Sequence, residues 1–286
     1  MTIEVKKAID DLVAKGIKLP PQPDVLIRLQ KTFSSDSYKM SNLAQIVSSD
    51  PSITAMLFKT VNSPVFSNGK KLVSIEQVLI VIGIRQVINL VQAISIATCI
   101  SDANRKSFDI FWTRSRELAE LASLVASDRV SVCNIFPDQA YMAGIFHDCG
   151  VPILMQRFPD YCSKLNLETT LYWPTLAEED ALFNVDHCTI GYLIARHWKL
   201  PDFICKSILA RNEIPREEFG AVRSLVAILQ LALHIYYRLA RINDPLWIKI
   251  RTDVLTELGI HPETEQEYIE EISEQFLNRQ DNPLDC

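Results

Sequence analysis

The chain has 286 residues, 48% of them hydrophobic and 22% charged, which is enough to bury a large core in one or two globular domains. The net charge of −6 is concentrated in residues 251–286, which carry ten acidic side chains against two arginines, so the rest of the chain is close to neutral. Only 8 residues are glycine and no two are spaced as G-x-G, which excludes the glycine-rich phosphate loops of dinucleotide-binding and Walker-type proteins. The lysines and arginines are not clustered, which argues against direct binding to nucleic acid or to a membrane surface.

The cysteines and the apolar segments predict the compartment. Seven cysteines lie far apart without a C-x-x-C pair, as is typical of free thiols in a reducing cytosol. The first residues lack the apolar segment of a signal peptide. The apolar run over residues 78–100 carries Arg85, Asn89 and Gln92 on one helical face, and an arginine at a bilayer centre is costly. We therefore expect a cytoplasmic protein in which this run is a buried helix or a helix pair broken near Gly83.

Local signals predict the first helices in chain order. The proline-rich segment over residues 18–23 is expected to be extended, because each proline disfavours helix in the residue before it. Asp50 before Pro51 is typical of an N-cap and predicts a helix over residues 52–60. The Ser74-x-x-Gln77 motif is a capping box that opens the next apolar helix. These helices would form the N-terminal part of the fold.

The remaining apolar runs also repeat with a helical period. Apolar residues recur on one face over residues 111–128 and again over residues 222–239. Residues 263–276 place four large apolar side chains on one face and most acids on the other, which favours a docked helix over a disordered acidic tail. This helix would dock either on its own chain or across a homodimer. We predict an all-α fold with a body over residues 1–241 and an acidic helical extension over residues 242–286.

His147 and Asp148 are the first candidates for chemistry, because an imidazole and a carboxylate stand side by side after an apolar segment. We expect them on a helix ended by Gly150 and Pro152. Adjacent helical residues point about 100° apart, so a metal ion would need further ligands from other helices. On spacing alone, a structural role is favoured over a site. The other histidines outside the motifs below are expected to be packing or surface residues: His197, His234 and His261.

A series of short motifs strengthens the case that His147 and Asp148 belong to a functional site. In chain order they are Lys18-Leu-Pro-Pro-Gln-Pro, Ser49-Asp50-Pro51, Val61-Asn62-Ser63, Ser74-Ile-Glu-Gln77 before Ile82-Gly83, Phe111-Trp112-x-x-Ser115, Ala143-Gly144-Ile145-Phe146-His147-Asp148-x-Gly150, His187-x-x-x-Gly191 and Trp198-x-Leu200-Pro201. In this order and spacing, the chain resembles the HDOD family over about residues 18–240. That family is a bacterial signalling branch of the HD-domain superfamily, whose founding members are metal-dependent phosphohydrolases. The resemblance implies a two-lobed all-α HDOD fold, with an N-terminal helical lobe over 18–110 and an HD-like lobe over 111–241.

The resemblance also implies a metal site from which this sequence departs. The resemblance implies that an active HD site consists of a first His, the His-Asp pair and a distant Asp, often with further histidines. The first-ligand position holds Arg114, a later His pair is replaced by Arg211-Asn212, and the distant Asp falls on Leu233. Arginine is permanently charged and leucine has no donor atom, so neither can bind a cation. The vestigial metal-site positions are therefore Arg114, His147, Asp148, His187, Arg211 and Leu233.

The resemblance and its departures together predict a non-catalytic regulatory or interaction module in bacterial signal transduction, with no catalytic residues, metal or cofactor. Its partner would be a protein of a signalling pathway, and homodimerisation stays open. We expect Arg114 to donate to Asp148 and to take the place of the cation. The alternative is a metal-dependent phosphohydrolase acting on a nucleotide or cyclic dinucleotide, with His147, Asp148 and His187 as surviving ligands.

Overall fold

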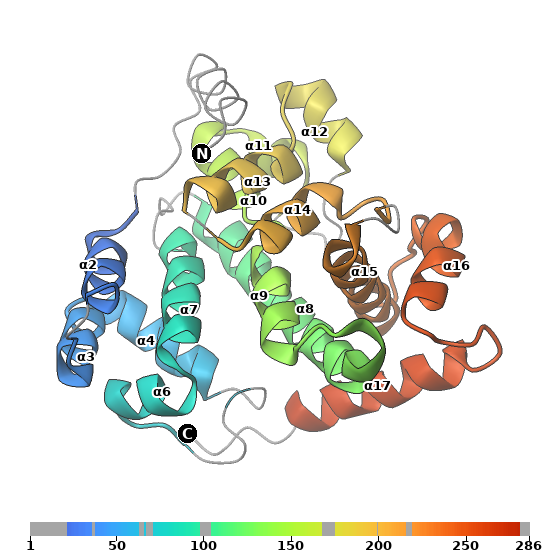
Figure 1. Ribbon diagram of the computed structural model, residues 1–286. Coiled ribbons are helices and arrows are strands. Elements are labelled where there is room, and N and C mark those ends of the chain that lie inside the picture. The colour runs from blue at the N-terminus through green and yellow to red at the C-terminus, as the bar shows by residue number, and fades with distance from the viewer. Residues whose placement is uncertain are drawn as a thin grey trace. The chain divides into compact units, whose positions relative to one another are not determined.

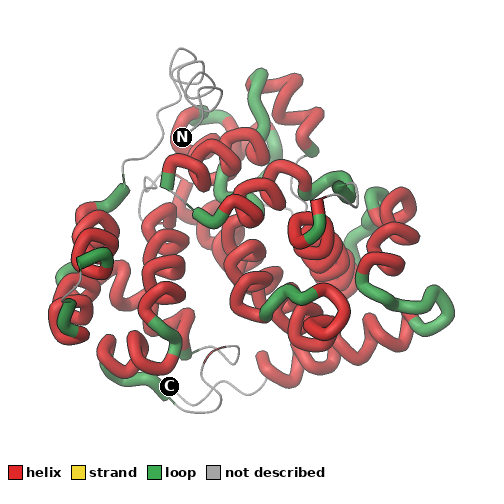
Figure 2. The backbone as a smooth tube through the Cα atoms, in the orientation of Figure 1, coloured by secondary structure: helices red, strands yellow, loops and turns green. Residues whose placement is uncertain are grey.

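The computed structural model describes residues 22–35, 38–62, 66, 71–97, 104–167, 175–198, 200–215 and 219–280, and every regular element in these ranges is a helix (Figures 1 and 2). The all-α prediction is confirmed. The described residues divide into two compact units, one made of residues 22–97 with residues 278–280 and the other within residues 104–277. The expected extended segment 18–23 lies outside the described residues as far as residue 21, and Pro23 directly precedes the first described helix.

The first unit is built from short helices around an aliphatic core. Helix α2 contacts α3 and α7, α3 also contacts α6, and α4 contacts α7. Leucines and isoleucines of three of these helices, including Leu26, Leu43 and Ile53, are fully buried. The elements are α2 (Asp24–Phe33), α3 (Met40–Ser48), α4 (Pro51–Val61), α6 (Ile75–Val81) and α7 (Ile84–Ala97).

Both predicted N-caps of this unit are confirmed. The Asp50 carboxylate accepts hydrogen bonds from the backbone N–H groups of Ser52 and Ile53, at 2.9 and 3.0 Å. Ser74 Oγ accepts from the backbone N–H of Gln77 at 3.2 Å. The Gln77 side chain in turn accepts from the backbone N–H of Val73 at 3.0 Å. These bonds satisfy donors that the first turn of a helix leaves unpaired.

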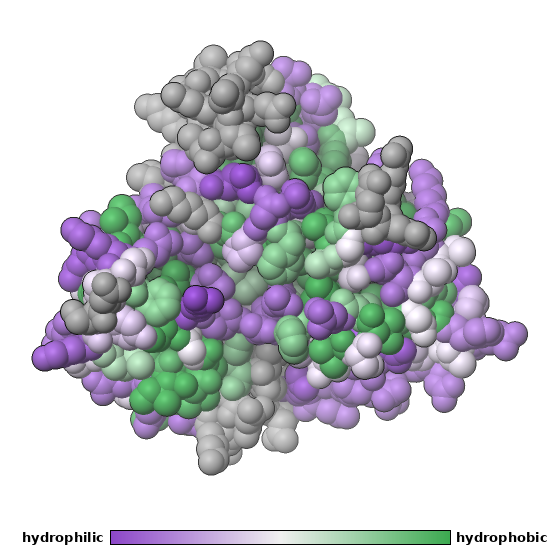
Figure 3. All heavy atoms as spheres, viewed as in Figure 1, coloured by the Kyte–Doolittle hydropathy of each residue, from purple (hydrophilic) through white to green (hydrophobic). Residues whose placement is uncertain are grey.

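The apolar run after Ser74 is a bent helix pair, as predicted. Gly83 separates α6 from α7 with a φ of +89°, a conformation that a residue with a side chain rarely adopts. Within the described residues no single helix is long and apolar enough to span a membrane; α6 and α7 together reach that length and composition, with a bend of 118°. Figure 3 shows hydrophobic side chains gathered over α6, where Ile80 and Val81 are 69% and 59% exposed.

The second unit is centred on three helices, since α8 contacts both α9 and α15 extensively. A Cβ on Gly144 of α9 would lie 2.5 Å from Ala119 Cα of α8, so this close helix crossing requires the glycine. Helix α13 packs against α10 and α14, and α16 packs against α15. The bounds are α8 (Arg105–Cys133), α9 (Pro137–Phe146), α10 (Val151–Arg157), α11 (Tyr161–Lys164), α12 (Leu176–Phe183), α13 (His187–His197), α14 (Asp202–Ala210), α15 (Ala221–Leu239), α16 (Trp247–Glu257) and α17 (Glu265–Gln280).

The acidic extension is docked on its own chain. Its apolar stripe is buried, each member being at most 7% exposed: Tyr268, Ile269, Ile272 and Phe276. The Arg129 guanidinium of α8 lies over the Tyr268 ring, 4.7 Å from its centroid. Glu265 joins the two helices of the extension, because its carboxylate accepts from Trp247 Nε1 at 3.1 Å and from Arg251 Nε at 2.6 Å. The docked-helix prediction is confirmed in its intramolecular form.

Deleting residues 262–286 should therefore lower the free energy of unfolding by at least about 3 kcal/mol. Each large apolar side chain that is fully buried contributes about 1.5–3 kcal/mol, and the deletion removes four of them, but the conformational entropy of ordering α17 offsets part of that sum. Urea unfolding of the full chain and of the truncated chain measures the difference. A chain ending at residue 280 is the control and should unfold like the full chain. Equal stability of the 1–261 chain would show that the packing of α17 contributes nothing.

Candidate functional site

The His-Asp pair lies in a turn between two helices, which corrects the expectation that it stands on a helix. Helix α9 ends at Phe146, residues 147–150 form the turn, and α10 begins at Val151 with Pro152 in its first turn. Proline is favoured at the start of a helix, so it opens α10 instead of ending the helix that contains the pair. A Cβ on Gly150 would collide with the backbone carbonyl of His187. This close backbone contact brings α13, and with it His187, to the turn.

Asp148 is fully buried and is shared by three basic side chains. His147 Nε2 lies 3.0 Å from its Oδ2, and His187 Nε2 lies 3.3 Å from its Oδ1. Arg211 forms an ion pair with the same Oδ1 through its Nη1. The structure thus brings three of the predicted positions around the carboxylate of a fourth. A buried carboxylate is strongly disfavoured without a positive charge beside it, and Arg211 supplies that charge.

The two histidines have opposite electrostatic environments. His147 Nδ1 lies 2.5 Å from the carbonyl oxygen of Gly144, to which it donates when the ring is neutral. Burial and the nearby Arg211 charge hold the pKa of His147 well below its usual value. For His187, burial opposes protonation, but Cys188 and the Glu179 carboxylate raise its pKa to about 10. Near neutral pH we therefore describe His147 as neutral and His187 as protonated.

Glu179 orients His187 and was missed by the sequence analysis. This fully buried carboxylate of α12 lies 2.5 Å from His187 Nδ1 and accepts from the His187 backbone N–H at 3.0 Å. The Tyr161 hydroxyl donates to its other oxygen. Glu178, the residue before Glu179, forms a capping box with Thr175 that fixes the start of α12. That local motif is visible in the sequence, whereas the buried role of the next glutamate is not.

The two arginines contribute in different ways from those expected. Arg211, just after α14, provides the ion pair with Asp148 that we expected from Arg114. Arg114 of α8 is 2% exposed; its Nη2 donates to the Tyr237 hydroxyl at 3.0 Å, and its guanidinium lies over that ring, 5.4 Å from the centroid. The side chain of Gln230 donates to the Arg211 carbonyl at 2.8 Å. This hydrogen bond fixes the backbone position from which the Arg211 side chain extends toward Asp148.

The arginines nonetheless act on one cluster. Burial, with the charge of Arg114 as a smaller cause, lowers the pKa of Arg211 to about 10. The same Arg114 charge also contributes to the lowered pKa of His147. Both guanidinium groups therefore lie within electrostatic reach of the position that would hold a cation in an active HD site.

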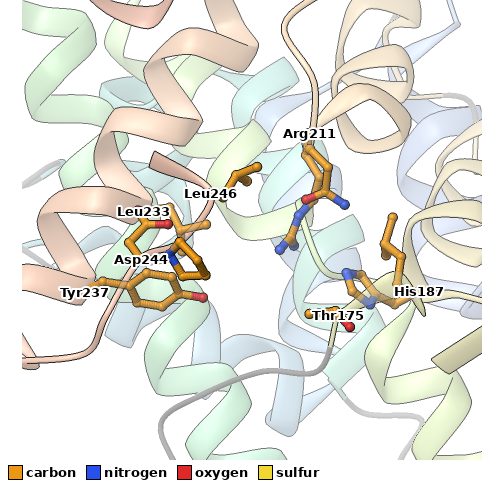
Figure 4. Close-up of a pocket in the computed structure, with 10 residues that line it drawn as sticks. Thr175, His187, Arg211, Leu233, Tyr237, Asp244 and Leu246 are labelled. Atoms are coloured by element: carbon orange, nitrogen blue, oxygen red, sulfur yellow. The ribbon is translucent and has the colours of Figure 1, made fainter. Parts of the chain in front are cut away.

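A pocket of about 210 Å³ opens beside this cluster (Figure 4). Three of the predicted vestigial positions line it, namely His187, Arg211 and Leu233. Tyr237, the acceptor of the Arg114 hydrogen bond, lies one helical turn after Leu233 on α15 and lines it as well. The other lining residues are Thr175, Leu176, Asn212, Asp244, Pro245 and Leu246.

The donor set at this site does not fit a divalent metal ion. Among the described residues, no three His, Cys, Asp or Glu side chains form a group that could hold a metal. The Asp148 carboxylate is engaged by a guanidinium, which carries a permanent positive charge and no lone pair to donate. Leu233 supplies no donor where the resemblance expects an aspartate.

The remaining histidines follow the predictions in part. His197 and His261 are exposed, as expected of surface residues. His234 is a packing residue with partners that the sequence analysis did not identify: its Nδ1 lies 3.0 Å from Asp244 Oδ2 and its ring stacks on Trp247 with centroids 4.1 Å apart. Both partners belong to the extension, so the histidine joins it to α15. The sequence separation of ten or more residues concealed this contact.

Comparison of the sequence with known protein families identifies the family of this chain. The HDOD domain matches residues 19–214 of the chain. The chain belongs to the HDOD-domain family. An uncharacterized protein of Treponema pallidum (strain Nichols) is 22% identical over 223 residues, which cover 75% of this chain. The chain spans 42% of the length of that relative, so the matching region there is part of a longer protein.

Solved structures share the HDOD fold over nearly the whole chain. An HDOD domain protein of unknown function from Geobacter sulfurreducens has a TM-score of 0.63 and 22% identity, covering 99% of this chain and 98% of that one. A protein from Marinobacter aquaeolei VT8, named provisionally for signal transduction, has a TM-score of 0.67 and 19% identity over 98% of this chain and 66% of that one. A protein from Shewanella amazonensis SB2B, named provisionally as a metal-dependent phosphohydrolase, has a TM-score of 0.65 and 17% identity over 96% and 98%. At these identities the likeness shows the fold alone.

Proposed function

We propose that this HDOD domain is a non-catalytic regulatory or interaction module in bacterial signal transduction. The observation that carries the proposal is the ion pair between Arg211 and the buried carboxylate of Asp148. A hydrolytic metal lowers the pKa of a bound water and clamps phosphate, and both tasks need an ion held in fixed geometry. A guanidinium paired with the principal carboxylate competes directly with such an ion. The site therefore stabilises the fold in place of holding a catalyst.

The alternative is a metal-dependent phosphohydrolase acting on a nucleotide or cyclic dinucleotide. One observation favours it: the Nε2 atoms of His147 and His187 both lie within 3.3 Å of Asp148, as they would around a shared ion. Under this alternative, these three residues would be the metal ligands and Arg211 would have to move away. We rank it second because the first and last ligands of the constellation are Arg114 and Leu233.

We expect the purified protein, supplied with Mn²⁺ or Fe²⁺, not to hydrolyse an aryl phosphodiester above the rate of a His147→Ala, Asp148→Ala double variant. The missing donors leave no held ion to generate a nucleophile at neutral pH. The assay measures release of the chromogenic phenol. A metal-dependent rate that the double variant abolishes would overturn the proposal.

Metal content provides an independent measurement. Protein purified without added metal should contain no stoichiometric Fe, Mn or Zn. A stoichiometric metal that Asp148→Ala removes would favour the hydrolase. Because this readout does not depend on the choice of substrate, it also covers a phosphohydrolase whose substrate is absent from the assay.

We further propose a cytoplasmic protein that acts through a protein partner of a signalling pathway, without direct contact to nucleic acid or membrane. The near-neutral body and acidic extension support the exclusion of nucleic acid. Five described cysteines are free, in keeping with a reducing compartment. The longer Treponema relative supports the idea that such a domain works beside other segments.

A further inference from the structure

The second unit carries a wide groove that is separate from the vestigial site. It measures about 750 Å³ and is formed by α13, α14, the residues that follow α14 and the start of α15 (Figure 1). Among its described lining residues, none is a vestigial metal-site position. Most of the lining is apolar or aromatic and includes Tyr192, Leu209, Phe219 and Val222. The groove is therefore an apolar surface that the proposed function does not use.

The exposure of two wall residues indicates what kind of occupant fits the groove. Leu209 is 49% exposed and Phe219 is 46% exposed. A site for a small molecule usually encloses about 70–90% of the ligand surface, whereas half-exposed walls leave one side of a ligand uncovered. Interfaces between proteins instead combine an apolar, aromatic centre with a polar rim. The groove therefore fits a protein surface better than a small ligand.

The charged side chains that line the groove have opposite signs and lie at different places along it. Lys206 lies within α14 and Glu213 lies beyond the end of this helix. Lys206 Nζ is 2.7 Å from Asp202 Oδ2, but Asp202 Oδ1 also forms an ion pair with Arg196. One carboxylate thus compensates two cations, which leaves one positive charge in excess on the Lys206 side.

Glu213 supplies a negative charge on the other side of the groove. Its side chain is exposed and forms no ion pair with any residue that the structure describes. The two arginines nearest to it in the following and preceding chain have other partners. Arg211 pairs with Asp148, and Arg223 Nε lies 2.6 Å from a carboxylate oxygen of Glu257. The charge of Glu213 therefore stays available to an incoming protein surface.

We propose that this groove is the interface of a homodimer, in which two copies of the chain dock around a two-fold axis. A two-fold interface brings the same patch of both copies together in opposite directions, so Lys206 of each copy faces Glu213 of the other. Phe219 of each copy packs into the groove of the other copy. A patch with one positive and one negative side matches itself in this arrangement, whereas a patch of a single sign would repel its copy. The inference goes beyond the proposed function and does not depend on it.

The first test is the mass of the full chain in solution, measured by light scattering over a dilution series. The chain has a mass of 32.5 kDa, and we expect a species of twice that mass that dissociates on dilution. Phe219→Ser should weaken the association at least about tenfold, because central aromatic side chains often carry much of the binding energy of an interface. Phe136→Ser is the matched control, since Phe136 is 53% exposed and does not line the groove. This control should associate like the unmodified chain.

Charge variants test the two-fold pairing itself. Lys206→Glu makes both sides of the groove negative, and Glu213→Lys makes both sides positive. Each variant alone should associate at least about fivefold more weakly than the unmodified chain, because both symmetry-related contacts change from attraction to repulsion. An equimolar mixture of the two variants should form the dimer again, since every contact then joins opposite charges. Sedimentation equilibrium of the three samples measures these differences.

Three results would overturn the inference: the full chain stays monomeric throughout the dilution series, Phe219→Ser associates as tightly as the unmodified chain, or the mixed charge variants associate no better than each variant alone. A monomeric full chain would leave the groove to a different protein or to a small molecule. The phosphodiesterase assay and the metal content do not depend on any of these results. The failure of the homodimer and the failure of the proposed function are therefore distinguishable.

Discussion

Replacing Arg211 by methionine is expected to lower the free energy of unfolding by about 3–5 kcal/mol, because it leaves the buried Asp148 carboxylate without its guanidinium. Methionine keeps much of the apolar length of the side chain, so the loss reports mainly on the charge. Arg105→Met is the matched control; its pair with Asp109 has side chains 65% and 63% exposed, and such pairs contribute little. Urea unfolding at pH 7 measures both variants.

A double variant separates the ion pair from packing. Asp148→Asn removes the charge that Arg211→Met leaves without its guanidinium, so the combination should be more stable than Arg211→Met alone. The difference between the double variant and the sum of the single variants gives the coupling of the pair. If the effects of the two substitutions simply add, Arg211 stabilises the fold by packing and does not compensate Asp148.

Local sequence signals were sufficient for much of the fold. Asp50 before Pro51 gave the start of α4, because a carboxylate N-cap and a proline in the first turn act within a few residues. The Gly83 break followed from a conformation that glycine adopts readily. The stripe of α17 was predictable because a helical period places apolar residues on one face, whichever surface they meet.

The site depended on packing that no local pattern encodes. Arg114 and Arg211 are chemically identical, and the resemblance placed both at vestigial positions. The structure sets Arg211 beside Asp148 because it follows the end of α14, whereas Arg114 donates to Tyr237 of α15. Which arginine reaches the carboxylate depends on how α14 and α15 pack around the turn after α9, and this is a long-range property.

Glu179 shows the same limit. It stands between Glu178 and Asp180, and the three acids look alike in the sequence. Only Glu179 of the three is buried, because it contacts Tyr161 and His187. A buried carboxylate needs such partners, but the partners lie 18 and 8 residues away. Helical periodicity indicates which residues share one face of α12, but it does not indicate which residues of other elements pack against that face.

Replacing Glu179 by glutamine should weaken the dependence of stability on pH that His187 imposes. In the folded chain Cys188 and Glu179 raise the pKa of His187 to about 10 against burial, whereas an unfolded histidine titrates near its usual value of 6.5. A group with a raised folded pKa contributes its full stability below the unfolded pKa and loses it as the pH rises toward the folded pKa. The unmodified chain should therefore lose up to about 1.4 kcal/mol for each pH unit above 6.5 from this residue. Glutamine keeps the shape but removes the charge, so the loss between pH 6.5 and 8 should be smaller.

Urea unfolding at several pH values between 6.5 and 8 measures this difference, and Glu178→Gln is the matched control because Glu178 is exposed on the same helix. Buried thiols such as Cys149, whose pKa burial raises, also cost stability when unfolded cysteines ionise at higher pH. That contribution is common to all three chains and cancels when their slopes are compared. The Glu178→Gln chain should follow the unmodified chain. If Glu179→Gln also runs parallel to the unmodified chain, Glu179 does not hold the proton on His187, and its role is confined to the hydrogen bonds that position the ring.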